Sequence, residues 1–294
     1  MSEYRISQAW GRGELAVKIW PGSEAALPIL AVHGWMDNAG TFNELAPRLR
    51  GHAIHALDLP GHGLSDPRPA GMRYHNADFL DDIYAAMAHI APNNGPLILL
   101  GHSLGAGLLM LIAGIFPERV KALILIDGLG PISADPANYA RDTRAAIENL
   151  ATYNPSRKPI ADIDQAVAAR RHGVAGMLSE RASRALCERA LRQTAAGELR
   201  WRTDKRLRLN SLMRYSEAQV LACIDAITAP CLLITGDQGL PNTLGKNQPR
   251  YAQRLAHFKQ LEQVALEGGH HLHLDDCPER VADAINAFLA AQGG

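Results

Sequence analysis

The chain has 294 residues, 47% of them hydrophobic and 20% charged, which are the proportions of a globular protein with a sizeable core. Thirty Lys and Arg balance thirty Asp and Glu, so net charge gives no reason to expect nucleic acid or an anionic membrane as a partner. No apolar run reaches the length of a membrane span, and MSEYRISQAWGRGELAVKIW lacks the apolar core of a signal peptide. The length suits one large α/β domain with an insertion, or two small domains.

The cysteines are scattered and show no C-x-x-C spacing; they are Cys187, Cys223, Cys231 and Cys277. Cysteines without such spacing are typically free, buried thiols in a reducing compartment, so we expect a cytoplasmic protein. No cysteine and histidine pair has the usual ligand spacing, and the sequence therefore predicts no zinc site.

Eight segments have the character of strands. In chain order they are Ile6–Ala9, Glu14–Trp20, Pro28–His33, His52–Leu59, Pro96–Gly101, Val120–Asp127, Pro230–Thr235 and Gln260–Leu266. The inner ones, such as LPILAVH, PLILLG and KALILID, are almost continuously apolar. Strands of a parallel sheet with helices on both faces have this composition. The pattern predicts an α/β fold with a mostly parallel eight-stranded sheet.

Helical segments alternate with these strands. Thr41 and Glu44 have the spacing of a capping box and predict a helix through Leu49. Further helices are expected over Asp81–Ile90 and Leu104–Phe116. The last helix should begin at Pro278, with one apolar face made of Val281, Ala284, Ile285, Phe288 and Leu289.

The alternation stops between residues 131 and 227. This stretch is helical in composition, has no clear apolar strand and is rich in arginine. Strand patterns resume at Pro230, so we interpret the stretch as a helical cap inserted into one domain. The predicted division is a core of residues 1–130 and 228–294 with a cap of residues 131–227.

The stretch GHSLG lies between the PLILL strand and the GAGLLMLIAG helix. G-x-S-x-G in this context is the pattern of a nucleophile elbow, which presents its serine at the end of a strand. Gly101 and Gly105 leave room where strand and helix approach, and Ser103 lies at the helix N-terminus, where free N–H groups favour a developing oxyanion. We predict that Ser103 is a nucleophile.

A serine nucleophile needs a base, and the EGGHHLHLD stretch after the last strand offers three histidines. We favour His270, which directly follows two glycines, over His271, and we interpret His273 as a structural residue of the loop. A metal site in this cluster is not expected, because no acidic or cysteine ligand stands at metal-binding spacing.

A third group must orient the imidazole. Two acids follow strands: Asp127 ends KALILID, and Asp237 follows CLLITG.

Two loops complete the predicted site. In AVHGWMDNAGTF the backbone N–H of Trp35 is the expected oxyanion donor, and the side chain of His33 should brace the loop. LDLPGHGLSDPRP, from Leu57 to Pro69, is expected to be a structural turn that contributes at most a pocket wall.

These motifs, in this order, resemble the α/β-hydrolase superfamily over nearly the whole chain. LAVHGWMDNAGTFNELAPRL, FPERVKALILIDGLGP and the C-terminal G-x-H-x-x-H are most similar to its serine-hydrolase-like branch. The resemblance implies Ser103 as nucleophile, His270 as base, and the N–H groups of Trp35 and Leu104 as the oxyanion hole. It also implies a helical cap between the sixth and seventh strands.

One position departs from the superfamily. Its triad acid commonly follows the seventh strand as G-x-x-D, but here that position holds Gly239. Some members carry the acid at the end of the sixth strand, where this chain has Asp127. We therefore favour Asp127, with Asp237 as the alternative and a dyad without an acid as the third interpretation.

A serine nucleophile argues against haloalkane dehalogenases and epoxide hydrolases, which use aspartate. It predicts an acyl-enzyme route on a small-molecule carboxylic ester or thioester, with no cofactor and no metal. Carbon–carbon bond hydrolysis and perhydrolysis use the same residues and stay open as alternatives. Because Gly239 replaces the usual acid, a catalytically weak ligand-binding protein is the alternative from another class. Arginines of the cap could favour an acidic substrate, or could simply be solvated; the oligomeric state is left open.

Overall fold

An eight-stranded sheet forms the centre of the computed structural model, which describes residues 2–8, 11–154, 159–173, 176–242 and 249–293. Its strands are β1 (Ser2–Ser7), β2 (Glu14–Trp20), β3 (Ile29–Val32), β4 (Ile54–Leu57), β5 (Leu97–His102), β6 (Val120–Ile126), β11 (Cys231–Gly236) and β12 (Leu261–Leu266). Their order in the sheet is β1-β2-β4-β3-β5-β6-β11-β12. β2 runs antiparallel to β1 and β4, and every other neighbouring pair is parallel.

The predicted strands are confirmed; Glu14–Trp20 has the predicted bounds, and the ends of the others differ by at most four residues. The largest difference is at the first strand, which begins at Ser2 rather than Ile6; the predicted end at Ala9 lies outside the described residues. The mostly parallel α/β fold predicted from the apolar runs is correct.

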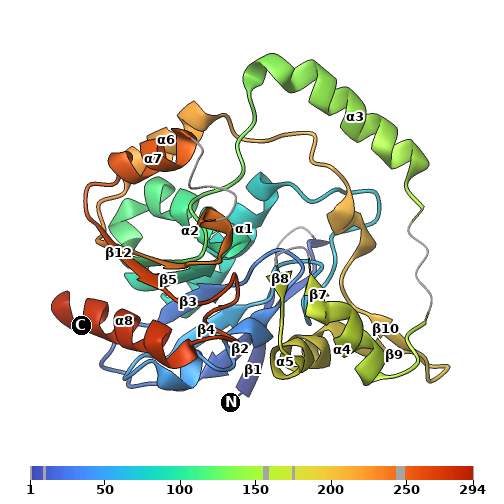
Figure 1. Ribbon diagram of the computed structural model, residues 1–294, viewed down its shortest axis with the longest axis horizontal. Helices are drawn as coiled ribbons and strands as arrows, with labels where there is room; N and C mark the ends of the chain where they lie inside the picture. The colour runs from blue at the N-terminus through green and yellow to red at the C-terminus, as the bar shows by residue number, and fades with distance from the viewer. Residues whose placement is uncertain (1, 9–10, 155–158, 174–175, 243–248, 294) are drawn as a thin grey trace.

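Helices cover both faces of the sheet (Figure 1). The core helices are α1 (Asn76–Ile90), α2 (Leu104–Ile115), α6 (Glu217–Ala226), α7 (Pro249–His257) and α8 (Pro278–Ala291). Alternate residues of the inner strands point to opposite faces. Those on one face pack with α1, α2 and α6 in the first core cluster, as Leu99 does, and those on the other pack with α8 in a second, as Leu100 does.

The predicted helix from Thr41 to Leu49 is wrong. Two short 3-10 turns, Ala39–Phe42 and Ala46–Arg48, take its place, and Asn38 caps the first by accepting from the N–H of Gly40 at 2.9 Å. Pro47 has no N–H to donate, which disfavours a continuous α-helix here. The Thr41 hydroxyl, expected to be a cap, instead bonds His273 Nε2 at 2.9 Å.

The chain leaves the sheet between β6 and β11, which are neighbours in it. This stretch contains α3 (Tyr139–Thr152), α4 (Ile163–Arg171), α5 (Glu180–Ala190) and α6, as its helical composition predicts. Contrary to expectation it also contains two short ladders: β7 (His172–Gly173) with β8 (Gly176–Met177), and β9 (Leu191–Gln193) with β10 (Leu199–Trp201).

The helices of this stretch are placed differently. α6 packs against α2 as part of the core, whereas α3 projects at the upper edge of the molecule (Figure 1). Three large apolar side chains of α3 remain exposed: Tyr139 and Ile147 at 57% and Leu150 at 50%. None of the helices within the described residues has both the length and the apolar character that crossing a bilayer requires.

Candidate active site

Ser103 occupies the sharp turn between β5 and α2. Its backbone has φ 53° and ψ −114°, a region that costs free energy for a residue with a side chain. The flanking glycines are required sterically. A Cβ at Gly101 would lie 2.5 Å from the backbone of Ala106, and one at Gly105 would lie 2.0 Å from the carbonyl oxygen of Val32. The turn therefore has the geometry of a nucleophile elbow, with Ser103 half-buried at its tip.

The loop after β3 passes beside this serine. The position of a Cβ on Gly34 would lie 3.1 Å from Ser103 Cβ. Met36 in the same loop also has a positive φ, of 64°. The Trp35 N–H has no backbone acceptor among the described residues, and Leu104 begins α2, so its N–H has no partner within the helix. Both predicted oxyanion donors thus lie next to Ser103 in the chain or in space.

His33 braces this loop. Its Nδ1 donates to the carbonyl of Gly34 at 2.7 Å, and its Nε2 accepts from the N–H of Leu59 at 3.0 Å. Burial lowers the pKa of His33 to about 4, so the ring is neutral at physiological pH. With both nitrogens occupied, His33 holds the loops after β3 and β4 together, as the sequence predicts.

His270 lies on the loop after β12. Its Nδ1 donates to Asp127 Oδ2 across 2.6 Å. Its backbone carbonyl accepts a hydrogen bond of 2.9 Å from Nε2 of His102, the residue directly before the elbow serine. The loop is therefore fixed both to the end of β6 and to the elbow. Within the described part of the chain Ser103 Oγ has no hydrogen bond to His270, and such bonds are often formed only once substrate is present.

Asp127 lies directly after β6 with φ 44°. Besides His270, its carboxylate accepts from the N–H of Gly236 at 3.1 Å and of Leu240 at 2.8 Å. A Cβ at Gly239 would lie 2.0 Å from Asp127 Oδ1. The Asp127 carboxylate thus fills the space that a side chain at position 239 would need, which explains why the superfamily's usual acid position is a glycine here.

Asp237, the alternative acid, binds the loop backbone instead. Its Oδ1 accepts from the N–H of Gly268 at 2.9 Å, and Asp276 Oδ2 accepts from the N–H of Gly269 at 2.8 Å. These carboxylates fix the two glycines that precede His270. The structure brings Asp127, and not Asp237, to the imidazole.

The sequence analysis missed Asp37, a buried acid in the loop after β3. Its Oδ2 accepts from His271 Nε2 at 2.9 Å and lies 3.7 Å from His102 Nδ1, while its Oδ1 pairs with Arg170 of α4. Burial alone would raise the pKa of Asp37, but the charges of His271 and Arg170 hold it well below its ordinary range. His271 thus belongs to a second carboxylate, separate from the one that holds His270. Only its place next to HGW in AVHGWMDN could have pointed to Asp37.

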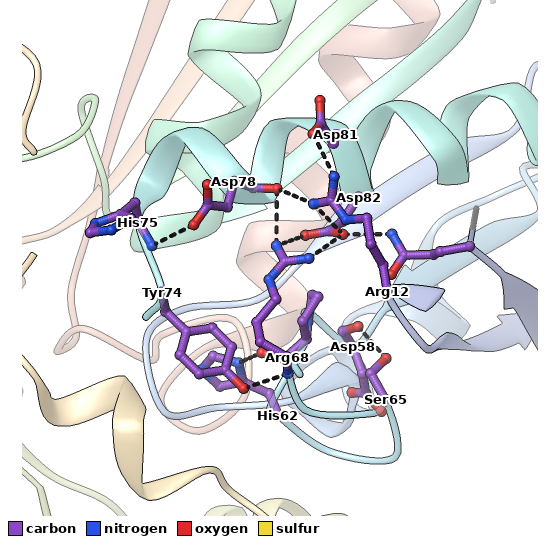
Figure 2. A network of polar contacts seen from close by, with 12 residues as sticks. Arg12, Asp58, His62, Ser65, Arg68, Tyr74, His75, Asp78, Asp81 and Asp82 are labelled. Atoms are coloured by element: carbon purple, nitrogen blue, oxygen red, sulfur yellow. Dashed lines mark hydrogen bonds and ion pairs between the residues drawn. The ribbon is translucent and has the colours of Figure 1, made fainter. Parts of the chain in front are cut away.

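The LDLPGHGLSDPRP turn is structural, as predicted, and Figure 2 shows the contacts that hold it. Asp58 accepts from the Ser65 hydroxyl through its carbonyl at 2.5 Å and from the N–H of Leu64 through its carboxylate at 2.7 Å. Arg68 reaches from the turn to α1, where its Nη1 lies 3.0 Å from Asp82 Oδ1, and both side chains are fully buried. The pair ties this turn to the helix that covers the sheet.

Arginines of the 131–227 stretch also pair with core acids. Arg170 pairs with Asp37, and Arg189 Nε of α5 donates to the buried Asp58 at 2.8 Å. Arg184 pairs within the stretch, with Asp164 at 2.7 Å. These contacts favour a structural role for the arginine-rich composition over recognition of an acidic substrate.

A cavity of about 750 Å³ lies between α3 and residues 210–219, with Tyr139 and Met213 in its wall. Its lining includes neither Ser103 nor His270, so the cavity is separate from the candidate active site.

Comparison with known proteins shows the family to which the chain belongs. Residues 28–276 match the family model described as the alpha/beta hydrolase fold. A probable serine hydrolase of Drosophila melanogaster is 34% identical over 298 residues, which cover 98% of this chain and 87% of the relative. The chain belongs to the α/β-hydrolase family, in its serine-hydrolase-like branch.

Other members of the family extend the comparison. A serine hydrolase-like protein of Danio rerio is 30% identical, over 99% of this chain and 89% of the relative. A hypothetical protein of Pseudomonas aeruginosa PAO1 has 36% sequence identity to this chain. Its crystal structure superposes with a TM-score of 0.88, and the match covers 99% of this chain and 100% of that one. The α/β-hydrolase fold predicted from the motifs is confirmed.

Proposed function

We propose that the protein hydrolyses a carboxylic ester or thioester through an acyl-enzyme on Ser103, with His270 as the general base and Asp127 as the acid that orients it. The observation that carries this proposal is the 2.6 Å contact between Asp127 Oδ2 and His270 Nδ1, on a loop that His102 fixes to the elbow. A carboxylate on Nδ1 leaves the Nε2 lone pair of the imidazole available to take a proton.

In the first half of the reaction, Ser103 Oγ attacks the carbonyl carbon of the substrate while its proton passes to His270 Nε2. The carbonyl oxygen becomes an oxyanion, which the N–H groups of Trp35 and Leu104 stabilise. When the tetrahedral intermediate collapses, the bond to the leaving alcohol or thiol breaks, and the leaving group takes the proton from His270.

In the second half, water attacks the acyl-enzyme and gives a proton to His270 Nε2. The second tetrahedral intermediate collapses to release the carboxylic acid, and the proton returns to Ser103 Oγ. The Asp127 carboxylate stabilises the imidazolium in both halves without itself becoming protonated. Its two backbone N–H contacts, from Gly236 and Leu240, hold it in that orientation.

Two observations favour this hydrolase over a catalytically weak ligand-binding protein. The sequence argument for weakness was Gly239, and the Asp127 carboxylate accounts for that glycine. Strained backbone also coincides with the residues of the site: Met36, Ser103 and Asp127 all have positive φ. Such strain persists only where the surrounding structure enforces it, and it clusters at functional sites.

Both ester and thioester substrates have support among the relatives. A thioesterase domain from the curacin biosynthetic pathway is 26% identical, with a TM-score of 0.79 over 99% of this chain and 100% of that one. A monoacylglycerol lipase of Mycolicibacterium smegmatis is 29% identical over about half of this chain. The reaction on Ser103 is the same for both bond types.

We further propose that the part of residues 131–227 that precedes α6 acts as a cap over the site, whereas α6 packs against α2 in the core. Arg170 of this segment reaches Asp37 beside the elbow, and the Asn38 side chain donates to the carbonyl of Leu186 on α5 at 2.9 Å. The cysteines are free thiols, which supports a reducing compartment such as the cytoplasm.

The proposal is tested with a fluorophosphonate probe and with p-nitrophenyl acetate. The wild-type protein should be labelled and should hydrolyse the ester, and Ser103→Ala should lose both. Ser23→Ala removes an exposed hydroxyl that is distant from Ser103 in the sequence, so this variant should still be labelled and should still hydrolyse the ester. A folded wild-type protein that neither reacts with the probe nor cleaves short esters or thioesters would show that this site is not a serine hydrolase.

A further inference from the structure

Three buried side chains meet beside the elbow: Asp37 from the loop after β3, His102 from the end of β5 and His271 from the loop after β12. One potential ligand atom of each lies within 4.8 Å of the others. We propose that these residues form a binding site for a divalent transition-metal ion, with zinc as the best match.

His102 supplies the first argument. Its Nε2 lies 2.9 Å from the carbonyl oxygen of His270, and since a carbonyl only accepts, Nε2 carries the hydrogen. Nδ1 of the neutral ring is then a lone pair, and this atom is fully buried with no hydrogen-bond partner among the described residues. It faces Asp37 Oδ2, another acceptor, at 3.7 Å. The His102 Nδ1 lone pair and the Asp37 Oδ2 atom are both acceptors and repel each other in a buried place unless a proton or a cation lies between them.

The arrangement of His102 is also the usual one for a metal ligand. Metal-binding histidines donate their second ring N–H to a carbonyl or carboxylate, which fixes the tautomer that presents the other nitrogen to the ion.

Two of the three separations between ligand atoms bracket the value for a tetrahedral ion, and the third is within 4.8 Å. Bonds of about 2.0–2.1 Å imply ligand–ligand separations of roughly 3.3–3.5 Å. Here the Asp37 Oδ2 atom is 2.9 Å from His271 Nε2 and 3.7 Å from His102 Nδ1, on either side of that value. Two histidines and one carboxylate are a typical zinc set that leaves a fourth position for water, and imidazole selects zinc, copper or nickel over magnesium or calcium.

Gly34 keeps the space between these atoms open. A Cβ there would lie 3.0 Å from His102 Nδ1, 3.3 Å from Asp37 Oδ2 and 3.1 Å from Ser103 Cβ. An ion held by His102 and Asp37 therefore lies close to the elbow serine. The binding site does not depend on the reaction proposed above; an effect of metal occupancy on Ser103 rests on that proposed function.

Two groups compete with the ion. His271 Nε2 donates its hydrogen to Asp37, so metal binding at Nε2 requires that the proton move to Nδ1 of the neutral ring, and the hydrogen bond to Asp37 is lost. Arg170 pairs with the other oxygen of Asp37, and its positive charge opposes a second cation. Removing the arginine should therefore strengthen metal binding, which a merely structural network would not predict.

The experiment is a calorimetric titration of chelator-treated full-length protein with ZnCl₂, repeated with CoCl₂ while recording the visible absorption of bound Co²⁺. We expect one equivalent of Zn²⁺ to bind and one equivalent of Co²⁺ to give the bands of a tetrahedral site. Asp37→Asn and His271→Asn should each weaken binding at least about tenfold. Arg170→Gln should strengthen it by roughly threefold or more.

Two controls separate this site from adventitious binding. His172→Gln removes an exposed histidine, and Cys277→Ser removes a partly exposed thiol; neither should change the affinity. Circular dichroism melts establish that each variant is folded. His102→Ala would remove a buried ring and could unfold the protein, so the test uses the Asp37 and His271 variants instead. The absence of stoichiometric binding by the wild-type protein would overturn the proposal, as would affinity unchanged in both ligand variants or lost in either control. None of these measurements depends on the protein being a hydrolase.

Discussion

The position of the triad acid can be tested by moving it. Asp127 and a side chain at position 239 exclude each other, because a Cβ at Gly239 would lie 2.0 Å from Oδ1 and 2.5 Å from the other two carboxyl atoms of Asp127. The double variant Asp127→Gly/Gly239→Asp removes the obstructing carboxylate and places a new one after β11. Glycine also suits the φ of 44° at position 127.

The expected magnitudes follow from the role of the acid. Asp127→Asn should lower kcat by about 10⁴, which corresponds to about 5.4 kcal/mol of transition-state stabilisation. Gly239→Asp alone should be at least as damaging, because it forces a steric overlap and a second negative charge against Asp127. The double variant should exceed Asp127→Gly by at least about tenfold, or about 1.4 kcal/mol, so the two changes are strongly non-additive.

The assay is kcat/KM for p-nitrophenyl acetate, with the rate of fluorophosphonate labelling as an independent measure of Ser103 reactivity. Asp237→Asn is the matched control, because its carboxylate binds the N–H of Gly268 rather than His270. It should lose far less activity than Asp127→Asn. If Asp127→Asn stayed within tenfold of wild type, or if both Asn variants lost activity equally, the assignment of the acid would be refuted.

Two predictions concern stability. Arg68→Ala should lower the free energy of unfolding by about 1.5–3 kcal/mol in urea titrations, because among the described residues Arg68 alone binds Asp82 Oδ2, while Gln8 and Arg12 still bind Oδ1 (Figure 2). Arg5→Ala, at an exposed pair, should change it by less than about 1 kcal/mol, and equal losses would contradict this. Burial lowers the pKa of His33 to about 4 and of His62 to about 3, below the unfolded value of about 6.5. Their contribution is complete above pH 6.5 and is lost as the pH falls, by about 1.4 kcal/mol per pH unit for each ring. His62→Gln should make the dependence of unfolding free energy on pH shallower by that amount between pH 6 and 4.5, and an unchanged slope would count against it.

The sheet could be predicted because its determinants are local. Runs such as KALILID are long, apolar and bounded by polar residues, so these strands can be recognised from the local sequence. The elbow was equally local, since glycines on both sides of Ser103 are needed for one tight turn. The capping box failed because Thr41 is used by a distant partner, His273, and a local pattern carries no information about that contact.

The partner of His270 and the partner of His271 could be identified only from the three-dimensional structure. Choosing Asp127 over Asp237 from the sequence rested on strand ends alone, whereas the structure decides which of two neighbouring carboxylates reaches the ring. Asp37 and His271 are 234 positions apart, so no spacing rule could join them. The expectation that the histidine-rich loop binds no metal rested on spacing in the sequence and could not take account of this distant carboxylate.

The helices of the 131–227 segment differ in how readily each could be replaced by a foreign sequence. α4 and α5 insert Arg170 and Arg189 into the core, so replacing them would strand the buried carboxylates of Asp37 and Asp58. α3 buries little and directs Tyr139, Ile147 and Leu150 toward solvent. Grafting a foreign sequence in place of α3 should therefore disturb the folded core much less than replacing α4 or α5, which makes α3 the part of this segment most open to exchange.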